Sequence, residues 1–192
     1  MKQYIVNKIR ESIAVKEAIC RDEPLLDTIK AVAATITQSL QADHKILFCG
    51  NGGSAADAQH LAAEFSGRFY KDRNPLYAEA LHCNTSYLTA VGNDYGYDQV
   101  YARILKGIGR PGDVLVGIST SGNSANILEA IKVAKEQGMI VVSMTGNTGG
   151  KMKAGSDYLI NVPSNDTPRI QEAHILIGHI ICEIVENNLF GA

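Results

Sequence analysis

Short apolar segments that alternate with longer segments of helical spacing constrain the fold of this chain most. The short segments are residues 45–49, 114–118, 139–144 and 158–162, with a weaker candidate at 77–81. Apolar residues at helical spacing occupy residues 54–69, 99–107, 123–137 and 168–189. Strands that alternate with helices predict a parallel sheet with helices on both faces, which is a doubly wound, three-layer α/β sandwich.

Two more helices are expected before the first strand, over residues 3–20 and 24–42. Apolar residues recur in them at helical spacing, and Pro24 suits the first turn of the second helix. We find no internal repeat, low-complexity segment or linker in the sequence. We therefore expect one domain over residues 1–192, in which residues 1–42 are a helical extension of the same unit.

The composition argues against several classes of partner. The chain has a formal net charge of −2, which gives no electrostatic case for nucleic acid or for an anionic membrane surface. No apolar run approaches the roughly 18 residues of a membrane span. The N-terminal residues lack a signal-peptide core, so we expect a cytoplasmic protein. The scattered Cys20, Cys49, Cys83 and Cys182 are expected to be reduced core residues.

A hydroxyl-rich turn follows the strand at 114–118. It places Ser119, Thr120, Ser121 and Ser124 at the start of the next helix. Unpaired backbone N–H groups and the positive end of the helix dipole favour a phosphate there. The turn contains no Lys and is not a nucleotide-binding P-loop. It is expected to hold a single terminal phosphate.

A glycine-rich loop, residues 50–54, follows the first strand. Gly50, Gly52 and Ala55 imitate a dinucleotide fingerprint, but residue 70 is a tyrosine where an acidic residue should close the second strand. The alternative is a loop whose small residues let backbone N–H groups and the Asn51 amide approach a polyhydroxylated ligand. Because ligands of such sheets lie beyond the carboxyl ends of the strands, loops 50–54, 92–94 and 119–124 could converge.

Two helices carry side chains that could bind a metal ion. His60 and Glu64 share one face of their helix, and Gln171 and His179 share one face of the last helix. Two imidazoles with a carboxylate and an amide oxygen would suit a zinc-like divalent ion. Ordinary capping or core roles explain each residue equally well, so spacing alone leaves the question open. Arg68 fits either an ion pair with Glu64 or a contact to an anionic substrate.

The motifs together resemble one known family. They are Gly50-Asn-Gly-Gly-Ser54, His60-x-x-x-Glu64-x-x-Gly-Arg68, Val91-Gly-Asn-Asp94, Gly117-Ile-Ser-Thr-Ser-Gly-Asn-Ser124 and Arg169-Ile-Gln-Glu-x-His174-x-x-x-x-His179. This set resembles the phosphoheptose isomerases, which belong to the sugar-isomerase (SIS) domain class. The resemblance covers essentially the whole chain.

The resemblance implies a five-stranded parallel sheet and a homotetramer with active sites at subunit interfaces. It implies a phosphate site at Ser119, Thr120, Ser121 and Ser124, and a sugar site at Asn51, Gly52, Gly53, Asn93 and Asp94. It implies zinc, one ion per subunit, at His60, Glu64, Gln171 and His179. Glu64, Arg68 and Gln171 are also expected to contact the substrate.

The implied reaction converts sedoheptulose 7-phosphate to D-glycero-D-manno-heptose 7-phosphate through a cis-enediol, at the start of heptose synthesis for lipopolysaccharide or related glycans. A base must move a proton between C1 and C2, and Glu64 is the expected base. His179 is expected to serve in ring opening or in proton transfer between the oxygens. A metal ion near the enediol oxygens would act as a Lewis acid. A carboxylate held by zinc is a weaker base, so the sequence leaves open whether Glu64 is a metal ligand, the base or both.

One position departs from the family pattern. Some members carry an acidic residue just before Arg169, where this chain has Pro168. A role assigned to that acid does not transfer, and Asp166 cannot be assumed to replace it.

Three alternatives compete with this interpretation. Some non-catalytic SIS relatives bind the bacterial replication initiator, but they lack the acid and the imidazole found here at Glu64 and His179. Phosphosugar-sensing modules are usually fused to a DNA-binding domain, for which this chain has no room. Another ketose-phosphate isomerase would act on a sugar of different length.

Overall fold

A five-stranded, wholly parallel sheet forms the centre of the computed structural model, which describes residues 1–191. Its strands are β1 (Ile46–Gly50), β2 (Ala78–Ala80), β3 (Val114–Ser119), β4 (Ile140–Thr145) and β5 (Tyr158–Asn161), in the order β2-β1-β3-β4-β5. The predicted strands all form, and the five-stranded parallel sheet is confirmed.

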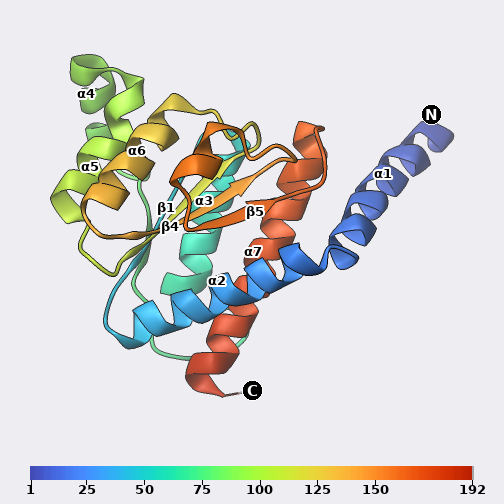
Figure 1. Cartoon of the computed structure of the whole chain (residues 1–192), viewed down its shortest axis with the longest axis horizontal. Coiled ribbons are helices and arrows are strands. Elements are labelled where there is room, and N and C mark those ends of the chain that lie inside the picture. The colour runs from blue at the N-terminus through green and yellow to red at the C-terminus, as the bar shows by residue number, and fades with distance from the viewer. Residues whose placement is uncertain (192) are drawn as a thin grey trace.

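Helices cover both faces of the sheet (Figure 1). One face carries α2 (Glu23–Gln41), α3 (Gly53–Ser66) and α7 (Thr167–Phe190), and the other carries α4 (Thr85–Tyr95), α5 (Val100–Ile108) and α6 (Ala125–Glu136). Successive residues of β1 point to opposite faces: Ile46 and Phe48 join the first core cluster, and Leu47 joins the second. Because both faces are buried, the strands are continuously apolar, and the doubly wound prediction is confirmed.

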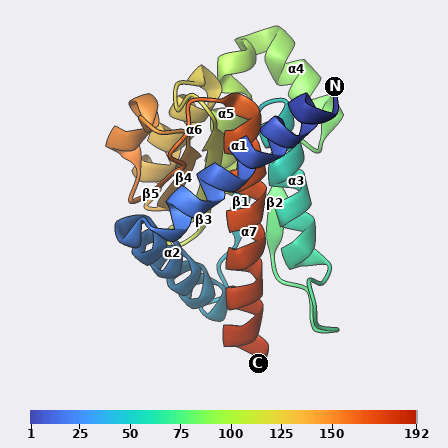
Figure 2. The same ribbon diagram turned by 90° about the vertical axis from the view of Figure 1, so that its right-hand side faces the viewer.

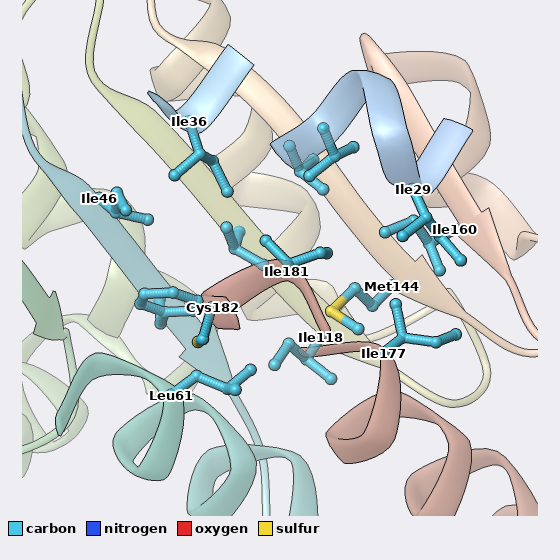
Figure 3. Close-up of a cluster of buried hydrophobic side chains, with 14 of the residues drawn as sticks. Ile29, Ile36, Ile46, Leu61, Ile118, Met144, Ile160, Ile177, Ile181 and Cys182 are labelled. Atoms are coloured by element: carbon cyan, nitrogen blue, oxygen red, sulfur yellow. The ribbon is translucent and has the colours of Figure 1, made fainter. Parts of the chain in front are cut away.

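Helix α7 is central to the positioning of the site because it lies between α2 and α3 (Figure 2). Ile177 and Ile181 of α7 pack with Leu61 of α3 and with Ile118 of β3 in a continuous apolar cluster (Figure 3). All four side chains are at most 5% exposed. Burial of such a side chain is worth about 1.5–3 kcal/mol, so this cluster fixes α7 firmly against α3.

The N-terminal helix α1 (Lys2–Cys20) leaves the body of the molecule at an angle (Figure 1). Ile19 is its buried residue, whereas Ile5, Ile9 and Ile13 are about half exposed. As predicted, α2 begins with Pro24 in its first turn, and Asp22 caps it by accepting a hydrogen bond from the Leu25 N–H at 3.1 Å.

Two expectations from the sequence are wrong. Residues 92–95 belong to helix α4 and not to a loop, because Asn84 caps the helix and it continues to Gly96, whose φ is +84°. A 3₁₀ turn, Tyr97–Gln99, lies directly before α5. Of the cysteines, Cys49 and Cys182 are buried as expected, but Cys20 and Cys83 are exposed.

A second 3₁₀ segment (Gly150–Gly155) lies between β4 and β5. Within residues 1–191, no helix has both the length and the apolar character that crossing a membrane requires.

Candidate functional site

A pocket of about 380 Å³ lies beyond the carboxyl ends of β1 and β3. Its walls are two of the predicted loops and the start of α7, with the lining residues Asn51, Gly52, Gly53, Ser54, Ile118, Ser119, Thr120, Ser121, Ser124, Thr167 and Gln171. The structure therefore brings together eight residues that the sequence assigned to substrate (Asn51, Gly52, Gly53, Ser119, Thr120, Ser121, Ser124 and Gln171).

Hydroxyl groups converge at one end of this pocket. The Oγ atom of Ser119 lies 2.9 Å from that of Ser124 and 3.4 Å from that of Ser121. The turn between them requires Gly122, whose φ is +65° and whose missing side chain makes room for the Gly149 carbonyl. Because α6 starts directly after Ser124, the positive end of its dipole faces this hydroxyl cluster.

The glycine-rich loop is held by residues that sequence reasoning missed. The side-chain amides of Asn51 and Asn126 exchange two hydrogen bonds, of 2.9 and 2.8 Å, and the Tyr97 hydroxyl donates to Asn51 Oδ1 at 3.2 Å. A Cβ at Gly53 would meet the amide of Gln171 at 2.5 Å, so the glycine lets this amide lie directly against the loop. Neither Asn126 nor Tyr97 stands in a spacing that would have identified it.

The third predicted segment does not join the pocket. Asn93 and Asp94 are exposed near the end of α4, where the Asn93 amide donates to Asp94 Oδ1 at 2.8 Å. The convergence expected of residues 92–94 rested on a loop, and the helix that replaces the loop places them outside the walls of the pocket.

His60 and Glu64 of α3 form a cluster with His179 of α7. The two helices lie side by side (Figure 2). The two Nε2 atoms of the histidines are 3.0 Å apart, and His60 Nε2 is 3.0 Å from Glu64 Oε1. One ligand atom from each residue lies within 4.8 Å of the others. Two imidazoles and a carboxylate at this separation are a donor set that suits a divalent ion such as zinc.

The other two residues expected at this cluster lie differently. Gln171 is half-buried, and its amide lies against Gly53 in the pocket, so its role as a fourth metal ligand stays a prediction. Arg68 is exposed, and it forms no ion pair with Glu64 among the described residues. The Phe69 ring instead lies 5.7 Å from the His179 ring, centroid to centroid.

Two titratable groups near the site have pKa values shifted by burial. Burial raises the pKa of the Asp57 carboxyl, and the nearby His60 opposes that rise. Burial lowers the pKa of His174 to about 4, opposed by a hydrogen bond of 3.0 Å between its Nε2 and the Thr145 carbonyl. His174 is therefore neutral and ties α7 to the end of β4.

The start of α7 shows what the departure at Pro168 means. Pro168 is exposed in the first turn of the helix, and the helix begins at Thr167 after Asp166. Thr167 lines the pocket, so a neutral hydroxyl stands next to the position where some family members carry an acid.

Comparisons with known proteins agree with this architecture. The model of the SIS domain family matches residues 10–146. The phosphoheptose isomerase of Aneurinibacillus thermoaerophilus is 56% identical, over 99% of this chain and 96% of the relative. The solved phosphoheptose isomerase of Neisseria gonorrhoeae superposes with a TM-score of 0.91 at 47% identity, covering 97% of this chain and 98% of its own.

A second solved phosphoheptose isomerase, from Francisella tularensis, gives a TM-score of 0.92 at 35% identity, covering 96% of this chain and 97% of its own. Because similarity at this level extends over the full length of each protein, the family of the domain is established. The chain belongs to the phosphoheptose isomerase family of SIS-domain proteins.

Proposed function

We propose that this protein is an aldose–ketose isomerase that converts sedoheptulose 7-phosphate to D-glycero-D-manno-heptose 7-phosphate. The observation that carries the proposal is that the first residues of α3 and α7 line the hydroxyl-rich pocket, while the His60–Glu64–His179 cluster lies farther along the same two helices. His60 lies seven residues after Gly53 on α3, which is about 10 Å along a helix. A phosphate anchored in the pocket and a proton-transfer group some distance away suit a substrate with several carbons.

The phosphate binds Ser119, Thr120, Ser121 and Ser124, and the hydroxyls of the sugar chain meet Asn51, Gly52, Gly53 and Gln171. Because neutral hydroxyls and the α6 N-terminus supply the attraction in this pocket, the phosphate is held by hydrogen bonds and by the helix dipole. Arg68, Asn93 and Asp94 are proposed as further substrate contacts, which lie outside the pocket walls of the isolated chain.

Glu64 takes a proton from C1 of the ketose and returns it to C2, so that the reaction passes through a cis-enediol. A second proton moves from O1 to O2 in the same conversion, and His179 is the residue proposed for that transfer or for ring opening. Both groups are partly exposed beside His60, so a substrate can reach them. Acid–base catalysis of this kind contributes about 10²–10⁴-fold to the rate.

The cluster also fits a resident divalent ion, which we propose to be zinc, with one ion per subunit. His60, Glu64 and His179 would hold it, and Gln171 is the proposed fourth ligand. When bound, such an ion polarises the carbonyl and enediol oxygens as a Lewis acid. Because Glu64 Oε1 is within reach of both His60 and the cluster centre, this residue is shared between the metal site and proton transfer.

The protein is further proposed to act as a cytoplasmic homotetramer with active sites at subunit interfaces, and as a single-domain enzyme of heptose synthesis for lipopolysaccharide or related glycans. An oligomer is supported by the exposed apolar residues of α1, which are Tyr4, Ile5, Ile9 and Ile13. Apolar side chains exposed together commonly mark a protein–protein interface. Size-exclusion chromatography with light scattering measures the number of subunits.

Incubation of the purified protein with sedoheptulose 7-phosphate tests the function. Formation of the heptose 7-phosphate is the expected result, and a hexulose 6-phosphate serves as the control for substrate length. Faster turnover of the hexulose would replace the proposal by another ketose-phosphate isomerase. The absence of turnover with either sugar, together with binding of the replication initiator, would favour the non-catalytic alternative.

A further inference from the structure

A buried carboxylate, Glu186, lies on α7 two turns beyond His179 and takes no part in the proposed chemistry. It accepts hydrogen bonds from the backbone N–H groups of Phe69, Tyr70 and Lys71 at 3.2, 2.9 and 3.0 Å. Burial alone would raise its pKa, but these bonds, together with one from the Arg73 side chain, outweigh burial and lower the pKa, so the group is ionised. Glu186 thereby fixes the segment that follows α3.

Arg73 completes this arrangement from the opposite side. Its Nε donates to Glu186 Oε1 at 2.8 Å, and the two side chains are only 3% and 2% exposed. Its Nη1 and Nη2 donate to the carbonyls of Phe65 and Glu64 at 2.9 and 2.8 Å. Carbonyls in the last turn of a helix have no partner within the helix. Arg73 donates hydrogen bonds to two of these carbonyls at the end of α3, and one of them belongs to Glu64.

The pair therefore bridges the same two helices as the catalytic cluster. Arg73 holds the backbone of Glu64, and Glu186 holds the backbone of Phe69, whose ring lies against the His179 ring. We propose that Arg73 and Glu186 are positioning residues that set the relative placement of Glu64 and His179. This inference deepens the proposed function and rests on it for the identity of the catalytic groups.

The chemistry of arginine makes the role specific. A guanidinium has donors in a fixed, planar fork, which here reach a carboxylate and two helix carbonyls at once. Lysine keeps the charge but cannot reach all three acceptors in that geometry. A buried ion pair also adds little stability compared with apolar residues of similar size, so stability alone does not explain it.

The test compares the intact protein with Arg73→Lys and with the double variant Arg73→Met/Glu186→Met. The double variant replaces the pair by apolar side chains and leaves no buried charge, but the three backbone N–H groups that donate to Glu186 lose their acceptor. The rates are therefore compared at a temperature where circular dichroism shows that every variant is folded. We expect both variants to lower kcat on sedoheptulose 7-phosphate on the order of ten- to a hundredfold, because small misplacements of catalytic groups are costly. KM should change little, since the phosphate pocket is formed by other loops.

A second ion pair, at the amino ends of β1 and β3, provides a matched control. Lys45 Nζ lies 2.6 Å from Asp113 Oδ2, with side chains 12% and 1% exposed. The double variant Lys45→Met/Asp113→Leu should leave kcat unchanged at a temperature where it is folded. His44 Nδ1 lies 3.9 Å from Asp113, so the NMR signal of the His44 imidazole should change in this control variant.

Histidine NMR of the metal-free protein gives a readout that does not depend on activity. In Arg73→Lys the imidazole signals of His60 and His179 should shift while that of His44 stays, and the control should show the reverse. Unchanged kcat and unchanged His60 and His179 signals in both variants would overturn the inference. A wild-type protein without isomerase activity, but with these NMR shifts, would refute the proposed function and leave the positioning role standing.

Discussion

The Nε2 atoms of His60 and His179 lie 3.0 Å apart, although the residues are 119 positions apart in sequence and belong to different helices. At this distance two imidazoles either share one proton or serve as neighbouring ligands of one cation. Glu64 adds an oxygen 3.0 Å from His60 Nε2, so a carboxylate and two imidazoles lie close enough to exchange protons or to bind one ion. The packing of α3 against α7 brings these side chains together.

Replacement of Glu64 by Gln should remove nearly all turnover. The variant keeps the size of the side chain but loses the base, so kcat should fall by about 10²–10⁴-fold. Steady-state kinetics with sedoheptulose 7-phosphate measures the loss. Glu183→Gln, an exposed site on α7, is the control and should retain normal rates. Normal activity of Glu64→Gln would rule out the base assignment.

Chelation of divalent ions should lower both the melting temperature and the rate. A ligand that binds only the folded protein at 100 times its Kd stabilises it by about 2.7 kcal/mol, and this is lost when the ion is removed. Metal analysis and calorimetry before and after chelation measure the effect. His60→Gln should abolish the shift, whereas His82→Gln should keep it. An ion-free purified protein that is indifferent to chelators would contradict the metal proposal.

Sequence patterns were sufficient to predict the sheet and the loops of the pocket. Apolar strands and the hydroxyl turn are local features, so 114–118 and 119–124 could be placed by their composition. The pairing of His60 with Glu64 follows from helical spacing alone, whereas their meeting with His179 needs tertiary packing. The expectation that the side chains of these two helices form one site rests on the family resemblance and not on their spacing.

Other parts of the site depend on contacts that have no local signal. Glycine and asparagine at 92–93 suggested a loop, yet capping by Asn84 carries α4 through them to Gly96. Arg73 and Glu186 are 113 positions apart, and each could equally have been an exposed charge. Asn126 likewise gains its role only because α6 brings it to Asn51.

Removal of the hydroxyls at Ser121 and Ser124 should weaken binding of the phosphate. Hydrogen bonds to a charged group are worth about 1.5–3 kcal/mol each, so kcat/KM of the double alanine variant should fall more than tenfold. Kinetics with the phosphorylated substrate and competition by inorganic phosphate measure this loss. Ser86→Ala, at an exposed position on α4, is the matched control. An unchanged KM and an unchanged inhibition constant for phosphate would remove the phosphate role.

The buried, neutral His174 should make the protein less stable in acid. Its side chain is fully buried, its pKa is lowered to about 4 by burial, and its Nδ1 has no hydrogen-bond partner within residues 1–191. Between pH 6.5 and about 4 the unfolded chain binds a proton at this residue that the folded chain does not. The free energy of unfolding therefore falls as the pH is lowered through this window, by on the order of 3 kcal/mol at 1.36 kcal/mol per unit.

His174→Gln isolates this contribution, because its amide can still donate to the Thr145 carbonyl but does not titrate. Other groups whose protonation depends on pH, such as Glu186, are present in both proteins. The difference between the two plots of unfolding free energy against pH therefore measures the contribution of His174. Urea unfolding at several pH values should give a shallower decline for the variant between pH 6.5 and 4. Parallel curves for His174→Gln and the wild type would contradict this prediction, because they would show that folding does not change the pKa of His174.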